Sequence, residues 1–268
     1  MKWLVQEFLN NSSNVERVIT ALEMSSTAYL IVRLNKDYSL TVLHKGTRIP
    51  EDNSADILKK FTKNENIMVY GSKQFANVAQ SENFKPGSFW SEDFEYEVFK
   101  QKIGKELLNN EFVVGELSGL KPIWDSFFIR PTGNTKLFTG FTITLEDFLS
   151  WQERESDVNS AYVGQTLMIS PVKEIKAEYR FFVVEQQIVT ASSYVVEKST
   201  NINHKPSEEL MAYTKEMIDL FPLSKAFVID VAETDDGFKV IEYNNINSSG
   251  LYGCDELNIV QKINAMQL

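Results

Sequence analysis

The chain has 268 residues, of which 43% are hydrophobic and 24% are charged, a composition that suits one large or two modest globular domains. Its net charge of −10 argues against nonspecific nucleic-acid binding, because such binding needs a basic surface that neutralises phosphates. The low content of two histidines and one cysteine argues against a zinc site, a histidine-based catalytic triad and a disulfide framework.

We expect a cytoplasmic protein. No apolar run approaches the about 20 residues that a membrane-spanning helix needs. The N-terminus, MKWLVQEFLN, is too short and turns polar too soon for a signal peptide, and the lone cysteine, Cys254, fits a reducing compartment. The oligomeric state cannot be read from the sequence.

Strands and helices alternate through the first 90 residues. Apolar residues at helical spacing predict helices at Val15–Met24 and Ala55–Phe61, and β-branched and aromatic runs predict strands at KWLVQ, TAYLIVRL and LTVLHKG. The run NIMVYGSKQFANVAQ predicts a strand, a Gly71-Ser72 turn and a helix. We therefore expect a small open α/β unit with a mostly parallel sheet over residues 1–90. Such sheets place ligands at the carboxyl ends of strands, although Gly71-Ser72 could equally be an ordinary connection.

A second unit, residues 91–268, is predicted to follow a linker at Lys85-Pro86-Gly87. It should open with a helix over Ser91–Asn109, capped by Ser91. Farther on, the strand FFIRP and the run LFTGFTI flank a polar turn, with Arg130 and Lys136 on either side of it. Two cations beside a turn that contains a glycine suit a polyphosphate. Solvated basic residues on an exposed hairpin are nevertheless the more frequent outcome of such a pattern.

The middle of this unit predicts a connection between two lobes. Thr144 should cap a helix that buries Phe148 and Trp151. Because a proline does not fit inside a central strand, Pro171 predicts a connection at Ser170–Lys176, between lobes of about 120–170 and 171–268.

After this connection the chain resumes with a strand and a helix. Glu178 and Arg180 share one face of the strand, where they either serve a site or simply pair with each other. An amphipathic helix is predicted over Pro206–Phe221.

The segment AFVIDVAETDDGFKVIEYNN predicts a hairpin with a tight acidic turn at Asp235-Asp236-Gly237. A turn centred on Asp236 places Asp230 opposite Glu242, and Asn244 on the same side, among the apolar residues Val228, Ala232 and Val240. Two close carboxylates repel each other unless a proton or a cation lies between them, and Mg²⁺ prefers such oxygen ligands. The alternative is an exposed hairpin whose acids face solvent.

The order of these segments resembles the ATP-grasp superfamily. A basic strand and loop, an interlobe linker, a Glu-x-Arg strand and an acidic hairpin follow one another over roughly residues 120–255. Three sequence segments are similar to those of the R2K clade, which occurs widely in bacterial and phage proteins: FIRPTGNTKLFTG, SPVKEIKAEYRFFVV and VIEYNNINSSGLYGCD. The resemblance implies an α/β (α+β) fold, in which an N-terminal pre-ATP-grasp domain precedes a two-lobed ATP-grasp domain.

The resemblance also implies roles for individual residues. It makes Asp230, Glu242 and Asn244 the ligands of Mg²⁺, and Arg130 or Lys136 the main phosphate contact, where most members have a lysine. Arg180 would reach the γ-phosphate or the acyl substrate, and Glu178 the ribose hydroxyls. The adenine would meet the linker residues Pro171, Val172, Lys173 and Glu174, and the acceptor carboxylate would meet Asn247, Ser248 and Ser249. One phosphate contact common in the family is missing, because Val228 stands where an arginine is usual.

The activity that the resemblance implies is ligation with ATP and Mg²⁺. A carboxylate would be phosphorylated, and an amine or another nucleophile would then attack the acyl phosphate to form a C–N or similar bond. The partners would be small-molecule or peptide carboxylates and amines, with no nucleic acid and no membrane. Two alternatives stay open: a protein that binds ATP for sensing or for partner binding without ligation, and a kinase that stops after phosphorylating a small acceptor.

Overall fold

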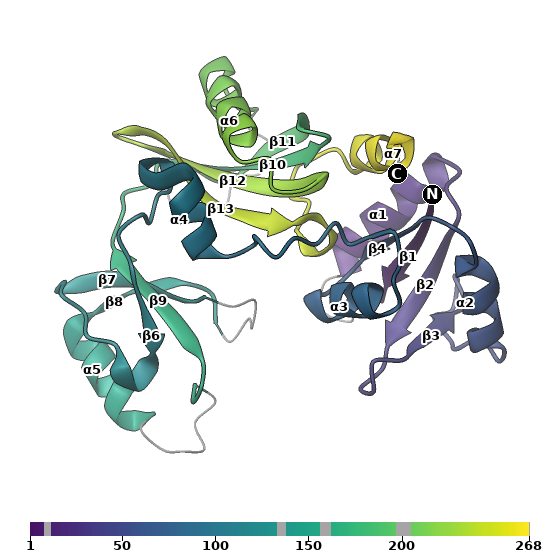
Figure 1. Ribbon diagram of the computed structural model, residues 1–268, viewed down its shortest axis with the longest axis horizontal. Helices are drawn as coiled ribbons and strands as arrows, with labels where there is room; N and C mark the ends of the chain where they lie inside the picture. The colour runs from purple at the N-terminus through teal and green to yellow at the C-terminus, as the bar shows by residue number, and fades with distance from the viewer. Residues whose placement is uncertain (8–11, 133–137, 156–161, 197–204, 268) are drawn as a thin grey trace.

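The computed structural model describes residues 1–7, 12–132, 138–155, 162–196 and 205–267. They form three sheets, one in each of three bodies (Figure 1). Within these ranges no helix is both long enough and apolar enough to cross a membrane.

The N-terminal body is the predicted α/β unit with a mostly parallel sheet. Its strand order is β3-β2-β1-β4-β5, and only β3 runs antiparallel to its neighbour. Apolar side chains alternate between the two faces, so that Trp3 and Val5 meet α1 while Leu4 and Val69 belong to the cluster around α2 and α3. The elements are β1 (Lys2–Gln6), α1 (Ser12–Met24), β2 (Tyr29–Leu34), β3 (Leu40–Leu43), α2 (Ser54–Thr62), β4 (Ile67–Tyr70), α3 (Lys73–Ser81) and β5 (Pro86–Gly87).

The middle body is a four-stranded antiparallel sheet covered on one side by α5 (Leu145–Arg154). As predicted, the Thr144 hydroxyl caps this helix by accepting from the Asp147 N–H at 3.1 Å, and Phe148 and Trp151 are buried. The strands are β6 (Val113–Glu116), β7 (Ser126–Pro131), β8 (Phe141–Thr144) and β9 (Thr166–Pro171), with a 3₁₀ turn η2 at Leu117–Gly119.

The placement of Pro171 corrects one prediction. It lies in a central strand, as the last residue of β9, and pairs with Phe127 of β7. A proline at the end of a strand removes only a single ladder hydrogen bond, so the strand tolerates it there. The connection between the lobes is therefore residues 172–176.

The C-terminal body carries a sheet of order β11-β10-β12-β13, with helices on both faces. α6 and α4 pack on one face, and α7 packs on the other against α1 of the N-terminal body. The elements are α4 (Tyr96–Ile103), η1 (Gly104–Glu106), β10 (Ala177–Val184), β11 (Gln187–Val196), α6 (Glu208–Leu220), β12 (Ala226–Thr234), β13 (Gly237–Asn245), η3 (Ile246–Ser248) and α7 (Glu256–Ala265).

The predicted helix over Ser91–Asn109 is wrong in its extent. The helix α4 covers only Tyr96–Ile103, with Glu95 at its N-cap, while the Ser91 hydroxyl closes a local turn by accepting from the Asp93 N–H. Gly104 ends the helix because it adopts a positive φ of 52°, a conformation that favours glycine.

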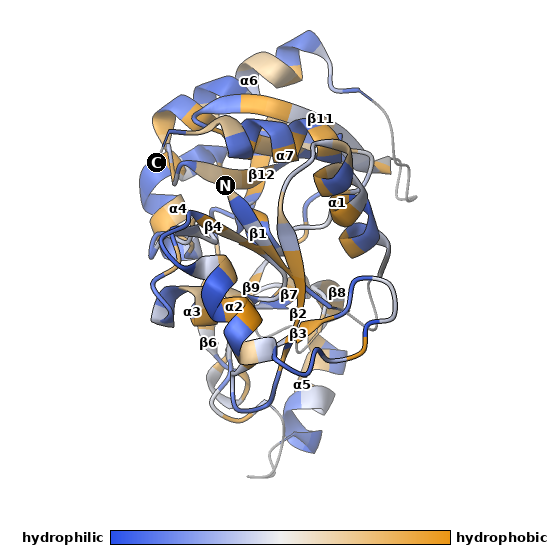
Figure 2. Ribbon diagram, turned by 90° about the vertical axis from the view of Figure 1, so that its right-hand side faces the viewer, coloured by the Kyte–Doolittle hydropathy of each residue, from blue (hydrophilic) through white to orange (hydrophobic). Residues whose placement is uncertain are grey.

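The N-terminal and C-terminal bodies share one hydrophobic core. Trp3 and Tyr70 of the first sheet belong to the same buried cluster as Phe182 and Val228 of the last sheet and Ile263 of α7. In Figure 2, hydrophobic and hydrophilic residues alternate along α1 and α7, as expected for helices that bury one side. Residues 1–90 and 91–268 are therefore joined by packing as well as by the chain. The middle body has a core of its own under α5, while Met168 of β9 belongs to the buried cluster of the C-terminal body.

Candidate functional site

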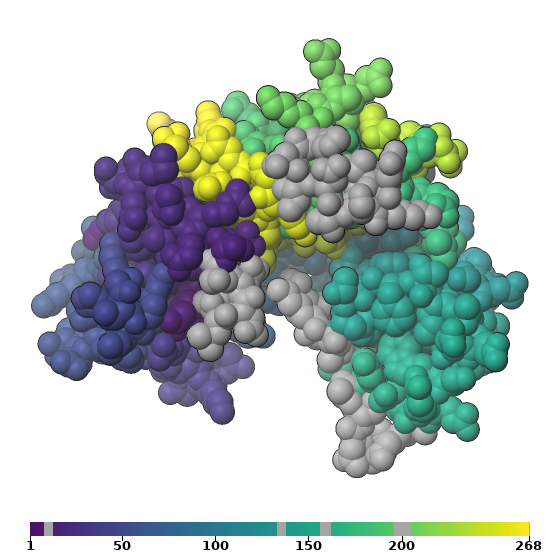
Figure 3. All heavy atoms as spheres, turned by 180° about the vertical axis from the view of Figure 1, so that it is seen from behind, coloured from purple at the N-terminus to yellow at the C-terminus, as the bar shows by residue number. Residues whose placement is uncertain are grey.

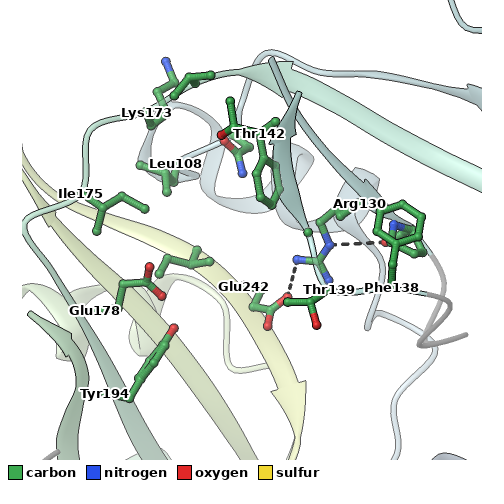
Figure 4. A pocket seen from close by; sticks show the side chains of 16 residues that line it. Leu108, Arg130, Phe138, Thr139, Thr142, Lys173, Ile175, Glu178, Tyr194 and Glu242 are labelled. Carbon is green, nitrogen blue, oxygen red and sulfur yellow. Dashed lines mark hydrogen bonds and ion pairs between the residues drawn. The ribbon is translucent and has the colours of Figure 1, made fainter. Parts of the chain in front are cut away.

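A cleft of about 760 Å³ lies between the middle and C-terminal bodies. Figure 4 shows side chains entering it from both sides: Arg130, Phe138 and Thr142 from the middle body, and Glu178, Tyr194 and Glu242 from the C-terminal sheet. Val172, Lys173 and Ile175 of the interlobe connection line it as well. From behind, the molecule is hollowed between residues of the N-terminal and middle bodies (Figure 3).

A β-bulge sets the register of the hairpin formed by β12 and β13. The turn is the pair Asp235-Asp236, because Thr234 pairs with Gly237, and this register alone would place Asp230 opposite Ile241. A register shift between Asp230 and Val231 inserts one residue into β13 and brings Glu242 opposite Asp230. The predicted pair therefore forms, although the predicted turn centre is wrong.

The same bulge corrects the placement of Val240. It pairs with Val231 and is buried with Ile229 and Tyr243 on the far face of the sheet. It is therefore not an apolar neighbour of the two acids, as an unbroken alternation had predicted.

The three predicted metal ligands lie together in the structure. Asn244 Nδ2 donates to Asp230 Oδ2 at 3.2 Å and to Glu242 Oε1 at 2.9 Å. Asp230 is only 1% exposed and Glu242 is partly buried, so these acids do not face bulk solvent. Among the described residues no group of three or more histidine, cysteine, aspartate or glutamate side chains could hold a metal. A metal here would therefore rely on two carboxylates and one amide.

Each of the two carboxylates is paired with an arginine. Arg180 donates from Nε to Asp230 Oδ1 at 2.8 Å and from Nη2 to Oδ2 at 2.6 Å, while Arg130 Nη1 donates to Glu242 Oε2 at 2.6 Å. The sequence left open a pair between Glu178 and Arg180, but the aspartate on the neighbouring strand is the partner of Arg180. Two-point pairing of this kind is the strongest geometry between guanidinium and carboxylate groups.

Arg180 is held on every side. Its Nη1 donates to the Gly250 carbonyl at 3.1 Å, and the rings of Tyr194 and Tyr252, stacked 4.7 Å apart, lie 5.6 and 4.8 Å from its guanidinium. The residue is 8% exposed. These contacts fix the Arg180 guanidinium beside Asp230.

The acids differ in their protonation behaviour. Burial raises the pKa of Asp230 and the Arg180 charge opposes this rise. Burial also acts to raise the pKa of Glu242, but the Arg130 charge and the hydrogen bonds from Asn244 and Arg130 outweigh it, and this pKa lies below its usual value. With both acids ionised, two carboxylates face two guanidinium groups and the cluster carries no net charge.

Glu178 lies at the other end of the cleft. It is partly buried and lines the cleft with Tyr194, and burial raises its pKa. Tyr194 was not predicted as a site residue. The sequence feature that could have indicated it is the short hairpin turn after Val184, because this turn brings β11 back beside β10.

The linker residues divide between two cavities. Val172 and Lys173 line the main cleft, whereas Glu174 lines a neighbouring cavity of about 260 Å³ with Lys173. Pro171 pairs within β9 and is not among the lining residues of either cavity. Lys136 and Gly133 lie outside the described residues.

The predicted substrate residues mostly hold the protein together. Asn247 is 1% exposed, and its Nδ2 donates to the carbonyls of Gly71 and Ser72 at 3.2 Å each, while the Gly71 N–H donates to the Asn247 carbonyl at 2.8 Å. The Ser249 hydroxyl donates to the Asn245 carbonyl at 2.8 Å, and only Ser248 is exposed. The Gly71-Ser72 turn is thus a docking point for η3.

Cys254 packs close to this site. It is 1% exposed, its Sγ lies 3.7 Å from the Arg180 carbonyl, and burial raises its pKa to about 12. A thiol in this state is a packing residue, since the reactive form of cysteine is the thiolate.

The sequence matches the model of a known protein family. Residues 56–263 match the ATP-grasp domain, R2K clade family 3. The chain belongs to this family. Its N-terminal α/β body is the pre-ATP-grasp domain, and the middle and C-terminal bodies are the two lobes of the ATP-grasp domain.

Solved structures of ATP-grasp proteins share the fold of this R2K-clade protein. The D-alanine–D-alanine ligase of Helicobacter pylori has a TM-score of 0.62 and 14% identity, with 98% of each chain covered. The ATP complex of the D-alanine–D-alanine ligase of Bacillus anthracis has a TM-score of 0.62 and 11% identity, covering 98% of this chain and 96% of that chain. A RimK domain ATP-grasp protein from Sphaerobacter thermophilus has a TM-score of 0.58 and 11% identity, with 92% of each chain covered. No curated protein matches the sequence.

Proposed function

We propose that this ATP-grasp protein is an ATP- and Mg²⁺-dependent ligase that joins a carboxylate to an amine or another nucleophile through an acyl phosphate. The observation that carries the proposal is the cluster of Asp230, Glu242 and Asn244 at the edge of the cleft, opposite Arg130. Its fold is that of ligases, one of which was solved with ATP.

The nucleotide would lie along the cleft from the connection to the acids. Adenine fits beside Val172 and Lys173, and the ribose hydroxyls fit near the Glu178 carboxylate, which lines the cleft with Tyr194. The phosphates would then reach Arg130, which is half-buried on β7 and pairs with Glu242. A guanidinium in a partly dry cleft attracts phosphate more strongly than one in water.

The donor set supports Mg²⁺ at the far end. Asp230 Oδ2 and Glu242 Oε1 both lie within hydrogen-bond distance of Asn244 Nδ2, so one position can be reached from all three side chains. A half-turn of the Asn244 amide would present its oxygen there. When bound, Mg²⁺ would neutralise the phosphate charge that develops during transfer. Because the cluster is already charge-balanced by the two arginines, we expect the phosphates to supply the charge that attracts the metal.

The chemistry needs no protein nucleophile. A substrate carboxylate oxygen attacks the γ-phosphorus, the bond from this phosphorus to the β–γ bridging oxygen breaks, and ADP leaves. The nucleophile then attacks the acyl carbon, phosphate leaves, and the amine releases a proton. Arg130 and the acidic cluster contribute position and charge stabilisation.

Titration of the whole chain with ATP, with and without Mg²⁺, tests the proposal together with an ADP-release assay against paired carboxylates and amines. We expect Mg²⁺ to bind tightly only with ATP, and ADP release to need both substrates. Nucleotide binding without release in any pair would favour the sensing alternative. Release with a carboxylate alone, and no need for an amine, would favour the kinase alternative.

Replacing Glu178 with glutamine should weaken ATP binding by about 10-fold or more, because a charged acceptor for hydroxyl groups becomes a neutral one. Calorimetric titration with ATP would measure the loss. Glu185→Gln, on the exposed turn of the same hairpin, is the matched control and should bind ATP as the wild type does. Equal affinities for all three proteins would place the ribose elsewhere.

A further inference from the structure

A second, smaller cavity of about 50 Å³ adjoins the cleft. Arg130 and Glu242 line both spaces, so their ion pair forms the wall between them. Figure 4 shows this pair from the cleft side as a dashed contact. The rest of the lining comes from Lys73 at the start of α3, from the segment before α4 and α4 itself, from Thr132 just after β7 and from the end of β13.

Asn245, in the lining of this cavity, has a buried hydrogen-bond donor that is unsatisfied among the described residues. It is 5% exposed, and its Oδ1 accepts from the Asn247 N–H at 2.9 Å, which fixes the orientation of the amide. Its Nδ2 is fully buried and has no hydrogen-bond partner among the described residues. Burying a donor without a partner is costly, so a donor of this kind indicates an acceptor that arrives with a ligand.

Lys73 adds a positive charge to the same lining. It is the first residue of α3, where the helix dipole also favours an anion, and its Nζ lies 5.4 Å from the centre of the Trp90 ring. Among the described residues it forms no ion pair with a carboxylate. Of the two acids in the lining, Glu242 is neutralised by Arg130 and Glu95 is exposed. An unmatched cation and an unmatched donor therefore face one small space.

We propose that this second cavity binds the carboxylate of the acid substrate, with Lys73 Nζ and Asn245 Nδ2 as its donors. The inference rests on the proposed ligase function, because the shared Arg130–Glu242 wall puts an acid in this cavity next to the phosphate end of the cleft. A volume near 50 Å³ holds an acid group with small neighbours, since one water needs about 10–15 Å³. Short-chain carboxylates are thus the substrate class that it fits. Their oxygen would attack the γ-phosphorus as described above, with ADP as the leaving group.

Binding of propionate to the whole chain without ATP tests this assignment separately from catalysis. Tryptophan fluorescence, at constant ionic strength set with chloride, should change with saturation, and the response should vanish in Trp90→Phe. Lys73→Met and Asn245→Asp should each weaken propionate binding by about 10-fold or more, because each removes a donor to the carboxylate. The side-chain amide signal of Asn245 in an NMR spectrum should shift with propionate.

The controls separate a folding defect from a lost contact. Lys59→Met replaces an exposed lysine on α2 of the same domain and should bind propionate normally. Thermal melting should show Lys73→Met nearly as stable as Lys59→Met, since the cation–π contact with Trp90 that the variant loses contributes little near the surface.

Each outcome decides one proposal. Unchanged propionate binding in both Lys73→Met and Asn245→Asp, or an equal response to chloride, would overturn the cavity assignment, while ADP release with paired substrates would still support the ligase. Loss of propionate binding in the variants, with no ADP release for any substrate pair, would support the cavity and overturn ligation.

Discussion

Replacing Glu242 with glutamine should reduce ADP release by at least about 10²–10³-fold, the scale seen when one group that stabilises transition-state charge is removed. Glutamine has nearly the same shape and can still accept from Asn244 Nδ2. It lacks the charge that pairs with Arg130 and that would share a metal with Asp230. The expected result is therefore a folded protein that loses most of its turnover, measured by ADP release at saturating ATP and Mg²⁺.

The control for this variant is Glu233→Gln, at the other end of the same hairpin. Glu233 pairs with Phe238 in the ladder and does not line the cleft, so its turnover should match that of the wild type. Wild-type turnover in Glu242→Gln would show that the acidic cluster is not the catalytic centre. A large loss of thermal stability in Glu242→Gln would instead assign the residue a structural role.

Replacing Arg180 with methionine should destabilise the fold by about 3–5 kcal/mol, because it leaves the Asp230 carboxylate buried without a counter-charge. The pair is 8% and 1% exposed and joins neighbouring strands β10 and β12. Asp230→Asn should destabilise the fold through the same mechanism, by leaving a buried guanidinium short of acceptors. Urea unfolding of each variant measures these losses.

The double variant, Arg180→Met with Asp230→Asn, decides whether the two residues act as a pair. Its loss of unfolding free energy should fall short of the sum of the single losses by about 1–3 kcal/mol, since neither residue then leaves an unmatched charge. Strictly additive losses would contradict the coupling that the two-point contact predicts. Glu185→Gln, on the exposed turn between β10 and β11, serves as the reference and should leave the free energy of unfolding unchanged.

Much of the local structure follows from the sequence because its causes are local. The Thr144 cap, the Asp235-Asp236 turn and the apolar runs of β1 and β12 each depend on residues a few positions apart. The spacing of Glu242 and Asn244 likewise places both on one face of β13 without any knowledge of the rest of the fold. The order of the strands, linker and hairpin along the chain resembles that of the ATP-grasp superfamily, and this order predicts the two lobes.

The tertiary structure decided which charges meet. Arg180 lies 50 positions from Asp230, and Arg130 lies 112 positions from Glu242. Nothing in the spacing of these residues distinguishes Asp230 from Glu178 as the partner of Arg180, because both can lie beside it once the strands pair. The choice follows from the order of β10 beside β12 and from the bulge at Ile241, which restores Glu242 to the face of Asp230.

The tertiary structure also decided the contact between the N-terminal body and the loop that follows β13. Asn247 and Ser249 are predicted substrate residues in a polar loop, and the shared core of the N-terminal and C-terminal bodies places that loop against the Gly71-Ser72 turn. The sequence by itself determined the strands, the caps and the set of oxygen-bearing side chains, since backbone preference and hydrophobic period act over short distances. The folded chain alone decided their partners, because ion pairs and buried amides are selected by packing between segments that are far apart along the chain.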